Sequence, residues 1–301
     1  MQQVPVFQGN VNLPQPAAGE PRAPRRQLEI GLIVVNYNSA QATAQLLVDL
    51  LQQDKSNCAL TVVVADNGPS KPGLGSLRQA YRDNPSVRFE EMTTNLGYFG
   101  AAHCALEAVW RDGLPDWIIV SNADIRLQQP GFFSRIADGM AGIGAVIAPR
   151  IVSTRTGLDQ NPFLRKRPSA LRMNLHRLIP RVPLLFWLMR TQCAVRRAVR
   201  SRLRGKHAPP ATASSYIYAP HGAFIIFSKE YFRRGGSLNA GAFLFAEEIF
   251  VAETCRRLGF GVAYSPTLEV LHDEHVSTKV NPAIRRYLAE STDYISREFF
   301  S

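Results

Sequence analysis

The chain has 301 residues, of which 46% are hydrophobic, and its formal net charge at pH 7 is +11. This length allows one large domain or two small ones, each with a buried core. No apolar run reaches the roughly eighteen residues of a membrane-spanning helix, and the N-terminus lacks the layout of a signal peptide. The four cysteines are widely spaced, which indicates reduced thiols rather than a disulfide framework or a zinc site.

The positive charge is concentrated in one segment. No carboxylate occurs between Asp159 and Glu230, and fourteen lysines and arginines lie in that interval. The other residues together carry a slight negative charge, so the basic character belongs to this segment and not to the whole chain.

Residues 1–27 contain five prolines and little periodic pattern, which predicts a disordered tail. Beyond the tail, short apolar runs alternate with segments whose apolar residues recur at helical spacing. The runs predict buried strands at 30–35, 60–65, 87–91 and 117–120. The segments between and after them predict helices from a cap at Ser39 through Leu51, from Leu74 to Arg82, and from 95–100 to about Trp110. A further helix is predicted over 132–140, with Pro130 as a first helical residue.

This alternation predicts an α/β fold with a mostly parallel sheet and flanking helices. Crossovers between parallel strands are right-handed, so the carboxyl ends of the strands meet at one edge. Three polar sequences follow the strands there: Asn36-Tyr37-Asn38, Asp66-Asn67-Gly68 and Ser121-Asn122-Ala123-Asp124. Open α/β sheets bind their ligands at this edge. The convergence therefore predicts a nucleotide pocket with a metal ion at its far end.

Asp124 is the candidate metal ligand, because it directly follows a buried strand and divalent cations such as Mg²⁺ take oxygen ligands. The alternative is an ordinary turn, since Asn and Asp favour turns for local hydrogen-bonding reasons. A dinucleotide-binding fold competes with the whole interpretation. It needs Gly-x-Gly-x-x-Gly directly after the first strand, where this chain has Asn36-Tyr37-Asn38-Ser39 without a glycine.

These sequences, taken in order, resemble the family 2 glycosyltransferases with the GT-A fold. The likeness rests on Val34-Val35-Asn36-Tyr37-Asn38, on Asp66-Asn67-Gly68, on the sequence of 95–100 and on Asn122-Ala123-Asp124. Segments 221–227, 243–248 and 264–272 are similar to the acceptor-side motifs of that family. The resemblance covers about residues 29–280 and is greatest to bacterial rhamnosyltransferase-like enzymes and to capsule or O-antigen enzymes.

The resemblance implies a role for particular residues. Tyr37 and Asp66 would hold the base and ribose of a nucleotide sugar, and Gly222 would let the backbone approach the donor sugar. Asn122 and Asp124 stand where the family has Asp-x-Asp, which leaves Asp124 as the main carboxylate for Mg²⁺ or Mn²⁺. The implied nucleotide-sugar-binding set is Val35, Tyr37, Asp66, Asn95, Gly97, Asn122 and Gly222.

His272 would be the second metal or diphosphate contact. The alternative for His272 is a histidine that is merely hydrogen-bonded at a strand end. His221 and His275 are expected to make local hydrogen bonds only.

Glu248, with Glu247 beside it, stands at the position of the catalytic base, where Asp is commoner in the family. An acceptor hydroxyl is a poor nucleophile until a positioned carboxylate takes its proton. The alternative is an acidic first helical turn that suits the helix dipole. The buried stripe expected of that helix is Ile249, Ala252, Cys255 and Leu258. Both interpretations can hold together.

The basic insertion, residues 161–216, is expected to leave the sheet. Its apolar run 184–189 contains a tryptophan. Val195, Val199 and Leu203 follow at four-residue spacing, with arginines around them. An apolar face beside a cationic face is typical of a helix lying in a membrane interface. The alternatives are a solvated basic helix packed on the domain and a nucleic-acid patch, although single-strand binders interleave aromatic residues that are absent here.

The sequence therefore predicts a metal-dependent, inverting glycosyltransferase. It would move a sugar from a nucleotide-diphosphate sugar to a bacterial surface-glycan acceptor that can be lipid-linked. It would be cytoplasmic and peripheral on the inner face of the plasma membrane, held there by residues 165–206. The expected parts are a donor half at 28–150, the basic insertion, a catalytic half at 217–280 and a C-terminal helix at 281–301. The alternative is an inactive protein of this fold that binds membranes or nucleic acid.

Overall fold

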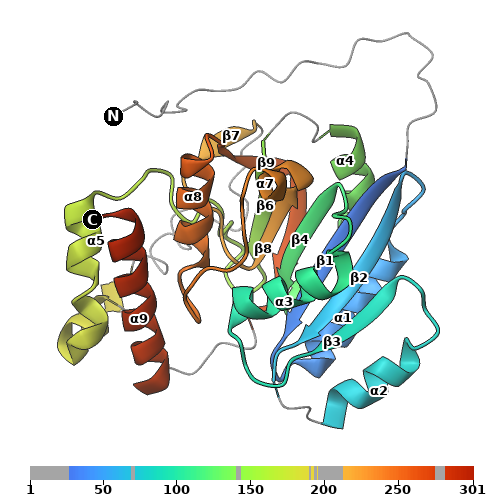
Figure 1. Cartoon of the computed structure of the whole chain (residues 1–301), viewed down its shortest axis with the longest axis horizontal. Helices are drawn as coiled ribbons and strands as arrows, with labels where there is room; N and C mark the ends of the chain where they lie inside the picture. Colours follow the sequence, from blue (N-terminus) through green and yellow to red (C-terminus); the bar gives the residue numbers. More distant parts are fainter. Residues whose placement is uncertain are drawn as a thin grey trace.

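The computed structural model describes residues 27–68, 72–139, 144–189, 191–192, 195, 213–274 and 282–301 (Figure 1). The strands are β1 (Leu28–Asn36), β2 (Cys58–Asp66), β3 (Val87–Glu91), β4 (Trp117–Asn122), β5 (Ile125–Arg126), β6 (Val146–Ser153), β7 (Ser215–Ile217), β8 (Phe224–Ser228) and β9 (Val262–His272). The helices are α1 (Ala40–Gln52), α2 (Pro72–Ala80), α3 (Tyr98–Trp110), α4 (Phe132–Gly139), α5 (Ala170–His176), the short 3-10 helix η1 (Ile179–Arg181), α7 (Lys229–Arg233), α8 (Glu247–Arg257) and α9 (Pro282–Phe299). The tail predicted for residues 1–27 lies outside the described residues apart from Gln27.

Within the described residues, nine strands form one sheet in the order β3-β2-β1-β4-β8-β6-β9-β5, and β7 pairs with β9. The neighbours β3, β2, β1 and β4 are all parallel, and the four strands expected from apolar runs are confirmed. Leu32, Ile33 and Val34 of β1 are wholly buried, because helices cover both faces of the sheet.

The second half of the sheet is mixed. β8 is antiparallel to both of its neighbours, β4 and β6, and β9 is parallel to β6 but antiparallel to β5 and β7. The α/β fold with flanking helices is therefore confirmed, with its parallel pairs mainly in the first half. Regular strand and helix alternation, which predicts parallel pairing, occurs only in that half.

Two hydrophobic cores lie on the two faces of the sheet. Alternate residues of a strand point to opposite faces, so Leu32 and Val34 pack with the α1 residue Leu46, whereas Ile33 packs with the α3 residue Phe99. Helices α1, α2 and α4 contribute to the first core, and α3, α8 and α9 contribute to the second (Figure 1).

Two helix starts differ from the sequence expectation. Ser39 does not cap α1 with its side chain, because its Oγ donates to the carbonyl of Tyr37. The side chain of Asn36 orders this helix start instead, since its Oδ1 accepts from the Ser39 amide at 3.1 Å and from the Thr43 hydroxyl at 3.0 Å. Pro130 lies in a turn, and α4 begins at Phe132.

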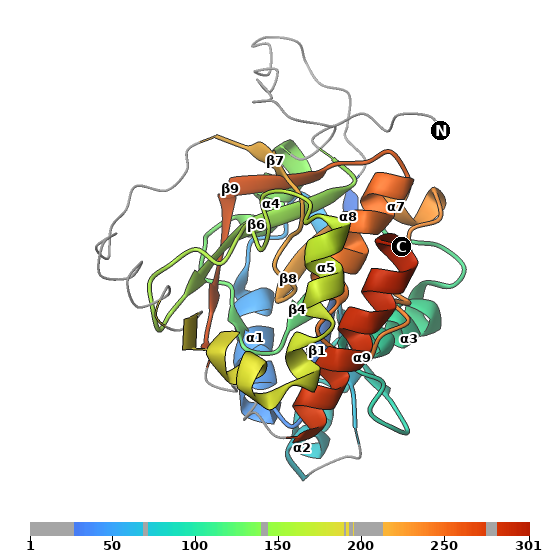
Figure 2. The same ribbon diagram turned by 90° about the vertical axis from the view of Figure 1, so that its left-hand side faces the viewer.

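The basic insertion returns to the sheet earlier than expected, because β7 begins at Ser215 and pairs with β9. Helix α5 and η1 pack beside α9, as Figure 2 shows. Arg177 and Arg181 both pair with Asp293 of α9, at 2.5 and 3.2 Å, and Arg167 pairs with Glu253 of α8 at 2.7 Å. Carboxylates from outside the insertion therefore neutralise part of its charge. Residues 196–212, which hold much of the remaining charge, lie outside the described residues.

Candidate functional site

The three polar sequences meet at one edge of the sheet, as predicted. In the register of β1, Asn36 is opposite Asp66 of β2, and Val35 is opposite Asn122 of β4. Val35 itself has its side chain in the core, 7% exposed, so only its backbone could reach a donor. The expected donor contacts of Val35 and Asn122 stay predictions.

Asp66 supplies an unpartnered acceptor at this edge. It is 4% exposed, and its Oδ1 accepts from Asn36 Nδ2 at 3.2 Å. Its Oδ2 is buried and has no hydrogen-bond partner among the described residues. Burial raises the pKa of Asp66. A buried oxygen without a partner calls for a donor from a ligand, and the half-exposed Tyr37 ring lies against Gly68, beside Asp66.

Asn67 has a function at this edge that the sequence analysis did not assign. Its Oδ1 accepts from the Leu96 amide at 2.7 Å and its Nδ2 donates to the Gly97 carbonyl at 2.9 Å. Asn95 folds back on the same loop, because its Oδ1 accepts from the Gly97 amide at 3.0 Å. These bonds hold the loop before α3 against the end of β2. The only sequence signal for Asn67 was its place in the polar sequence after β2.

The backbone conformation at position 97 and the close approach of a neighbouring loop require a glycine. Its φ is +77°, and a Cβ at this position would lie 1.9 Å from the carbonyl oxygen of Phe243. The loop before α3 therefore packs directly on the loop before α8. Direct donor contacts from Asn95 and Gly97 stay predictions.

Asp124 and His272 form a pair at the far end of the edge. His272 Nε2 lies 3.3 Å from Asp124 Oδ1, and both side chains are largely buried. The pair exists because β5 is antiparallel to β9 with Ile125 opposite His272, and the Asp273 amide donates to the Asp124 carbonyl at 2.8 Å. Asp124 also lies in a turn, as the alternative interpretation expected, and its function as a metal ligand stays a prediction.

The donor set at this pair fits a hard divalent cation. One carboxylate and one imidazole are available, and no group of three or more His, Cys, Asp or Glu converges elsewhere in the described residues. Mg²⁺ is commonly held by one or two protein ligands together with waters and substrate phosphates. Gln160 Oε1 contacts His272 Nδ1 at 2.7 Å, which leaves Nε2 facing Asp124. Asp124 and His272 are thus the residues that would hold the cation.

Glu248 lies at the first turn of α8 and reaches the same region. Its Oε1 accepts from the Gly222 amide at 3.3 Å. A Cβ at Gly222 would lie 3.0 Å from this oxygen, so glycine lets the carboxylate approach the backbone. Burial raises the pKa of Glu248. A carboxylate with a raised pKa is suited to accepting a proton near neutral pH.

Glu247 differs from its neighbour in its surroundings. It is 6% exposed, and its Oε2 accepts from the Ala246 amide at 2.9 Å. Burial and the charge of Glu248 raise the pKa of Glu247 to about 8. The expected buried stripe of the helix is confirmed, since Ala252 and Cys255 are buried and Ile249 and Leu258 pack against the core. Glu247 is therefore held against the protein, whereas Glu248 reaches toward Gly222.

Tyr98 links these groups, and the sequence analysis assigned it no function of its own. Its hydroxyl donates to the Gly222 carbonyl at 3.0 Å. Burial, followed by the charges of Glu247, Asp124 and Glu248, raises the pKa of Tyr98 well above its ordinary value. Carboxylates from two distant parts of the chain thus act together with burial to keep the Tyr98 phenol protonated.

His221 is a local hydrogen bonder, as expected. Its Nδ1 accepts from the Ala223 amide at 3.2 Å. Burial and the neighbouring His272 lower the pKa of His221 to about 4, so its ring is neutral at pH 7. His275 lies outside the described residues.

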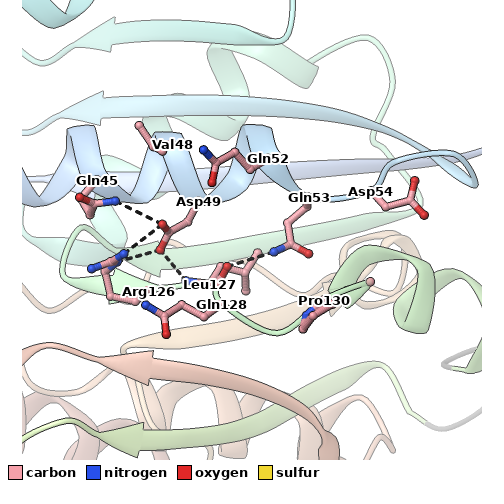
Figure 3. Close-up of a pocket in the computed structure, with 11 residues that line it drawn as sticks. Gln45, Val48, Asp49, Gln52, Gln53, Asp54, Arg126, Leu127, Gln128 and Pro130 are labelled. Atoms are coloured by element: carbon pink, nitrogen blue, oxygen red, sulfur yellow. Dashed lines mark hydrogen bonds and ion pairs between the residues drawn. The ribbon is translucent and has the colours of Figure 1, made fainter.

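A polar pocket of about 740 Å³ lies between α1 and residues 126–131 (Figure 3). Asp49 of α1 accepts from Arg126 at 2.7 and 3.1 Å and from the Leu127 amide at 3.0 Å. The Gln53 side chain donates to the Leu127 carbonyl at 3.0 Å. These side chains and backbone groups satisfy one another's hydrogen bonds. The bonds connect α1 to residues 126–127 and so fix the chain just after Asp124.

The match to known families covers more than half of the chain. Residues 32–203 match the model of glycosyl transferase family 2. A curated relative from Mycobacterium tuberculosis is 24% identical over 245 residues, which cover 78% of this chain and 74% of the relative. That relative is an N-acetylglucosaminyl-diphospho-decaprenol L-rhamnosyltransferase.

Solved structures resemble the fold. The crystal structure of GalNAc-T7 with UDP, GalNAc and Mn²⁺ has a TM-score of 0.61 at 13% identity, over 88% of this chain and 48% of that one. S. aureus TarS has a TM-score of 0.50 at 14% identity, over 89% of this chain and 43% of that one. The match thus covers less than half of each of these two solved chains. The protein belongs to glycosyl transferase family 2 and has the GT-A fold.

Proposed function

We propose that this protein transfers a sugar from a nucleotide-diphosphate sugar to a lipid-linked glycan acceptor in bacterial envelope polysaccharide synthesis, with inversion at the anomeric carbon. The observation that carries the proposal is that Glu248, bonded to Gly222, lies near the Asp124–His272 pair, since the rings of His221 and His272 are 5.9 Å apart. At the same edge of the sheet, Asp66 offers an unpartnered acceptor among the described residues. The lipid-linked acceptor is suggested by the mycobacterial relative, whose name specifies one.

The donor half, 28–150, would hold the nucleotide. The buried Oδ2 of Asp66 can accept only from an N–H or O–H group, which a base or a ribose offers. The exposed Tyr37 ring beside Gly68 offers an apolar face to the base. A divalent cation bound at Asp124 and His272 would neutralise charge on the leaving diphosphate as a Lewis acid.

The catalytic half, 217–280, would supply the base. Glu248 would take the proton of the acceptor hydroxyl as its oxygen forms a bond to the anomeric carbon. The bond from that carbon to the diphosphate oxygen breaks in the same displacement, and the electron pair leaves with the nucleoside diphosphate. A single displacement inverts the configuration. The raised pKa of Glu248 and the Gly222 hydrogen bond support this assignment, since the first favours proton transfer and the second orients the carboxylate.

We also propose that the outer face of the basic insertion binds an anionic membrane surface. Nine of the thirteen exposed large hydrophobic residues among those described lie between Leu171 and Val195. Leu171, Leu175 and Leu178 recur along one face of α5 and its end, while Met173 is buried on the other side. The following helical segment, 183–189, exposes 61% of Trp187.

Exposed cations accompany this apolar face. Arg165, Lys166 and Arg172 are exposed, and Arg172 follows Leu171 in α5. Each basic residue near an anionic leaflet contributes about 1 kcal/mol. Among the described residues, the structure has no helix that is both long and apolar enough to cross a bilayer. We propose a peripheral attachment through this apolar and basic face, on the cytoplasmic side of the membrane where a lipid-linked acceptor would be presented.

The catalytic proposal is tested with Asp124→Ala. Transfer or donor hydrolysis is measured on a panel of nucleotide sugars with Mn²⁺ or Mg²⁺. We expect metal-dependent turnover in the wild type and none in the variant, which should retain the wild-type melting temperature because Asp124 lies at a loop end. Undiminished activity of the variant at saturating metal would contradict the metal site. A wild type that is inactive with every donor would support a non-catalytic binding protein.

The membrane proposal is tested with a Leu171→Ser, Leu175→Ser and Trp187→Ser triple variant. Val48→Ser, an exposed apolar residue of α1, is the matched control. Binding to anionic vesicles should weaken with salt and be lost in the triple variant, while the control binds as the wild type does. Equal wild-type binding to neutral and anionic vesicles would contradict the charge contribution. Activity on a soluble acceptor analogue should survive in the triple variant.

A further inference from the structure

A chain of side chains holds His272 on the side opposite Asp124. His272 Nδ1 lies 2.7 Å from Gln160 Oε1, and Gln160 Nε2 donates to Glu274 Oε1 at 2.5 Å. The second carboxylate oxygen of Glu274 accepts from Arg155 Nε at 2.9 Å. The site described so far includes the contact of Gln160 with His272, but gives no function to Glu274 or Arg155.

This arrangement leaves one hydrogen-bonding pattern for the imidazole. A carboxylate only accepts, so Glu274 requires the amide nitrogen of Gln160 and turns its carbonyl oxygen toward His272. A carbonyl oxygen also only accepts, so His272 Nδ1 carries the proton. The lone pair of the neutral ring is then on Nε2, which faces Asp124 Oδ1 at 3.3 Å.

Two acceptors that face each other repel, unless a proton or a metal cation lies between them, and a divalent cation that binds the pair takes the place of that proton. A carbonyl or carboxylate behind a ligating histidine is the usual means of fixing its tautomer and orientation. We infer that Gln160, oriented by Glu274 and Arg155, is a positioning residue that sets the tautomer of His272 and so presents Nε2, with Asp124, to a divalent cation. The inference rests on the proposed function through the cation at this pair.

The backbone around His272 is fixed by the same part of the chain. The amide of Thr154 donates to the His272 carbonyl at 3.1 Å, and its hydroxyl donates to Asp273 Oδ1 at 2.6 Å. The amide of Gln160 donates to the Ile151 carbonyl at 2.8 Å. The loop after β6 therefore holds both the backbone and the ring of His272.

Replacing Gln160 with leucine removes the acceptor for Nδ1. The neutral ring is then free to place its proton on Nε2, where Asp124 accepts it, and that proton occupies the position of the cation. We expect Gln160→Leu to weaken Mn²⁺ binding by about 10- to 100-fold. Gln129→Leu is the matched control, because Gln129 also bridges to β9, through the Thr267 carbonyl and the Glu269 amide, but does not contact His272.

A swapped pair tests whether the hydrogen-bonding pattern, rather than packing alone, is responsible. In the double variant Gln160→Glu with Glu274→Gln, the new carboxylate at position 160 accepts from His272 Nδ1. The new amide at position 274 donates to that carboxylate. The carbonyl of the new amide can still accept from Arg155. The double variant should recover Mn²⁺ binding to within a few-fold of the wild type.

The experiment has two readouts on the full chain. Long-range ¹H–¹⁵N spectra of histidine-labelled, metal-free protein report the tautomer of His272, assigned by its loss in His272→Asn. Calorimetry with Mn²⁺ alone reports affinity. We expect Nδ1–H in the wild type and in Gln129→Leu, loss of that tautomer with weakened binding in Gln160→Leu, and recovery in the swap.

Three results would overturn the inference. Nε2–H in the metal-free wild type, or unchanged Mn²⁺ affinity in Gln160→Leu, would refute it while leaving the proposed transfer reaction intact. Wild-type protein that binds no Mn²⁺ would refute both the inference and the metal dependence in the proposed function.

Discussion

The backbone amide of Gly222 donates a hydrogen bond of 3.3 Å to the Oε1 atom of Glu248, 26 residues further along the chain. This bond connects the loop before β8 to the first turn of α8. The carbonyl of the same glycine accepts from Tyr98, so one residue holds both a carboxylate and a phenol in place. The candidate base therefore has a defined orientation before any acceptor arrives, which contributes to the rate of an enzyme-bound reaction.

Glu248→Gln should lower turnover by about 10²- to 10⁴-fold, because the amide keeps the shape and cannot take a proton. Donor binding should change little, since Glu248 is assigned to the acceptor side. Steady-state kinetics with a fixed acceptor and calorimetry with the donor measure the two effects. The parallel variant Glu247→Gln should retain most activity. If Glu247→Gln is the inactive one, the base is the preceding residue.

Glu247→Gln should make stability less dependent on pH. The pKa of Glu247 is about 8 in the folded protein against an ordinary 4.5, so the folded state binds the proton more tightly than the unfolded state does. The unfolding free energy of the wild type therefore falls as pH rises from about 4.5 to about 8. A glutamine cannot ionise, so the unfolding free energy of the variant does not fall in this way.

Urea unfolding should accordingly show similar stability of the wild type and Glu247→Gln near pH 4.5 and a more stable variant near pH 9, by roughly 1 to 4 kcal/mol. Glu107→Gln, on the exposed face of α3, should change stability by less than about 0.5 kcal/mol at either pH. A Glu247→Gln variant that is no more stable than the wild type near pH 9 would show that burial does not raise this pKa.

Gly97→Ala and Gly75→Ala should have opposite effects on stability. Gly97 has φ +77° and faces the Phe243 carbonyl, with which a Cβ would clash at 1.9 Å, so alanine should cost more than about 2 kcal/mol. Gly75 lies inside α2 with nothing within 4 Å of a Cβ, so alanine should stabilise by about 0.5 to 1 kcal/mol. Thermal unfolding measures both. A neutral Gly97→Ala would mean that the loops before α3 and α8 separate easily.

Asp49→Asn should destabilise the protein by about 1 to 3 kcal/mol, because Arg126 and the Leu127 amide lose a charged acceptor. Asp54→Asn is the control. Asp54 is exposed, and its side chain accepts only from the amide and hydroxyl of Ser56 among the hydrogen bonds of the described residues. Chemical denaturation of both variants gives the comparison. Equal stability of the two variants would show that the hydrogen bonds of Asp49 to Arg126 and Leu127 contribute nothing.

Long-range contacts account for the residues that sequence analysis did not assign. Tyr98 bonds a residue 124 positions away, and Gln160 contacts His272 across 112 positions. No local pattern reports such pairs, because their partners are chosen by the packing of separate strands. The cap expected at Ser39 failed for a local reason, since the Ser39 hydroxyl donates to the Tyr37 carbonyl and Asn36 accepts from the Ser39 amide.

The sequence by itself determined the first half of the sheet and the edge at which its polar loops meet. Apolar runs of strand length identify strands buried on both faces, and parallel connections bring their carboxyl ends together. The tertiary structure alone decided that β8 runs antiparallel between β4 and β6, and that His272 returns to Asp124. It also separated Glu248, held by Gly222, from Glu247, bonded to the Ala246 amide. Two adjacent carboxylates look alike in a sequence, and only the atoms packed around each one distinguish them.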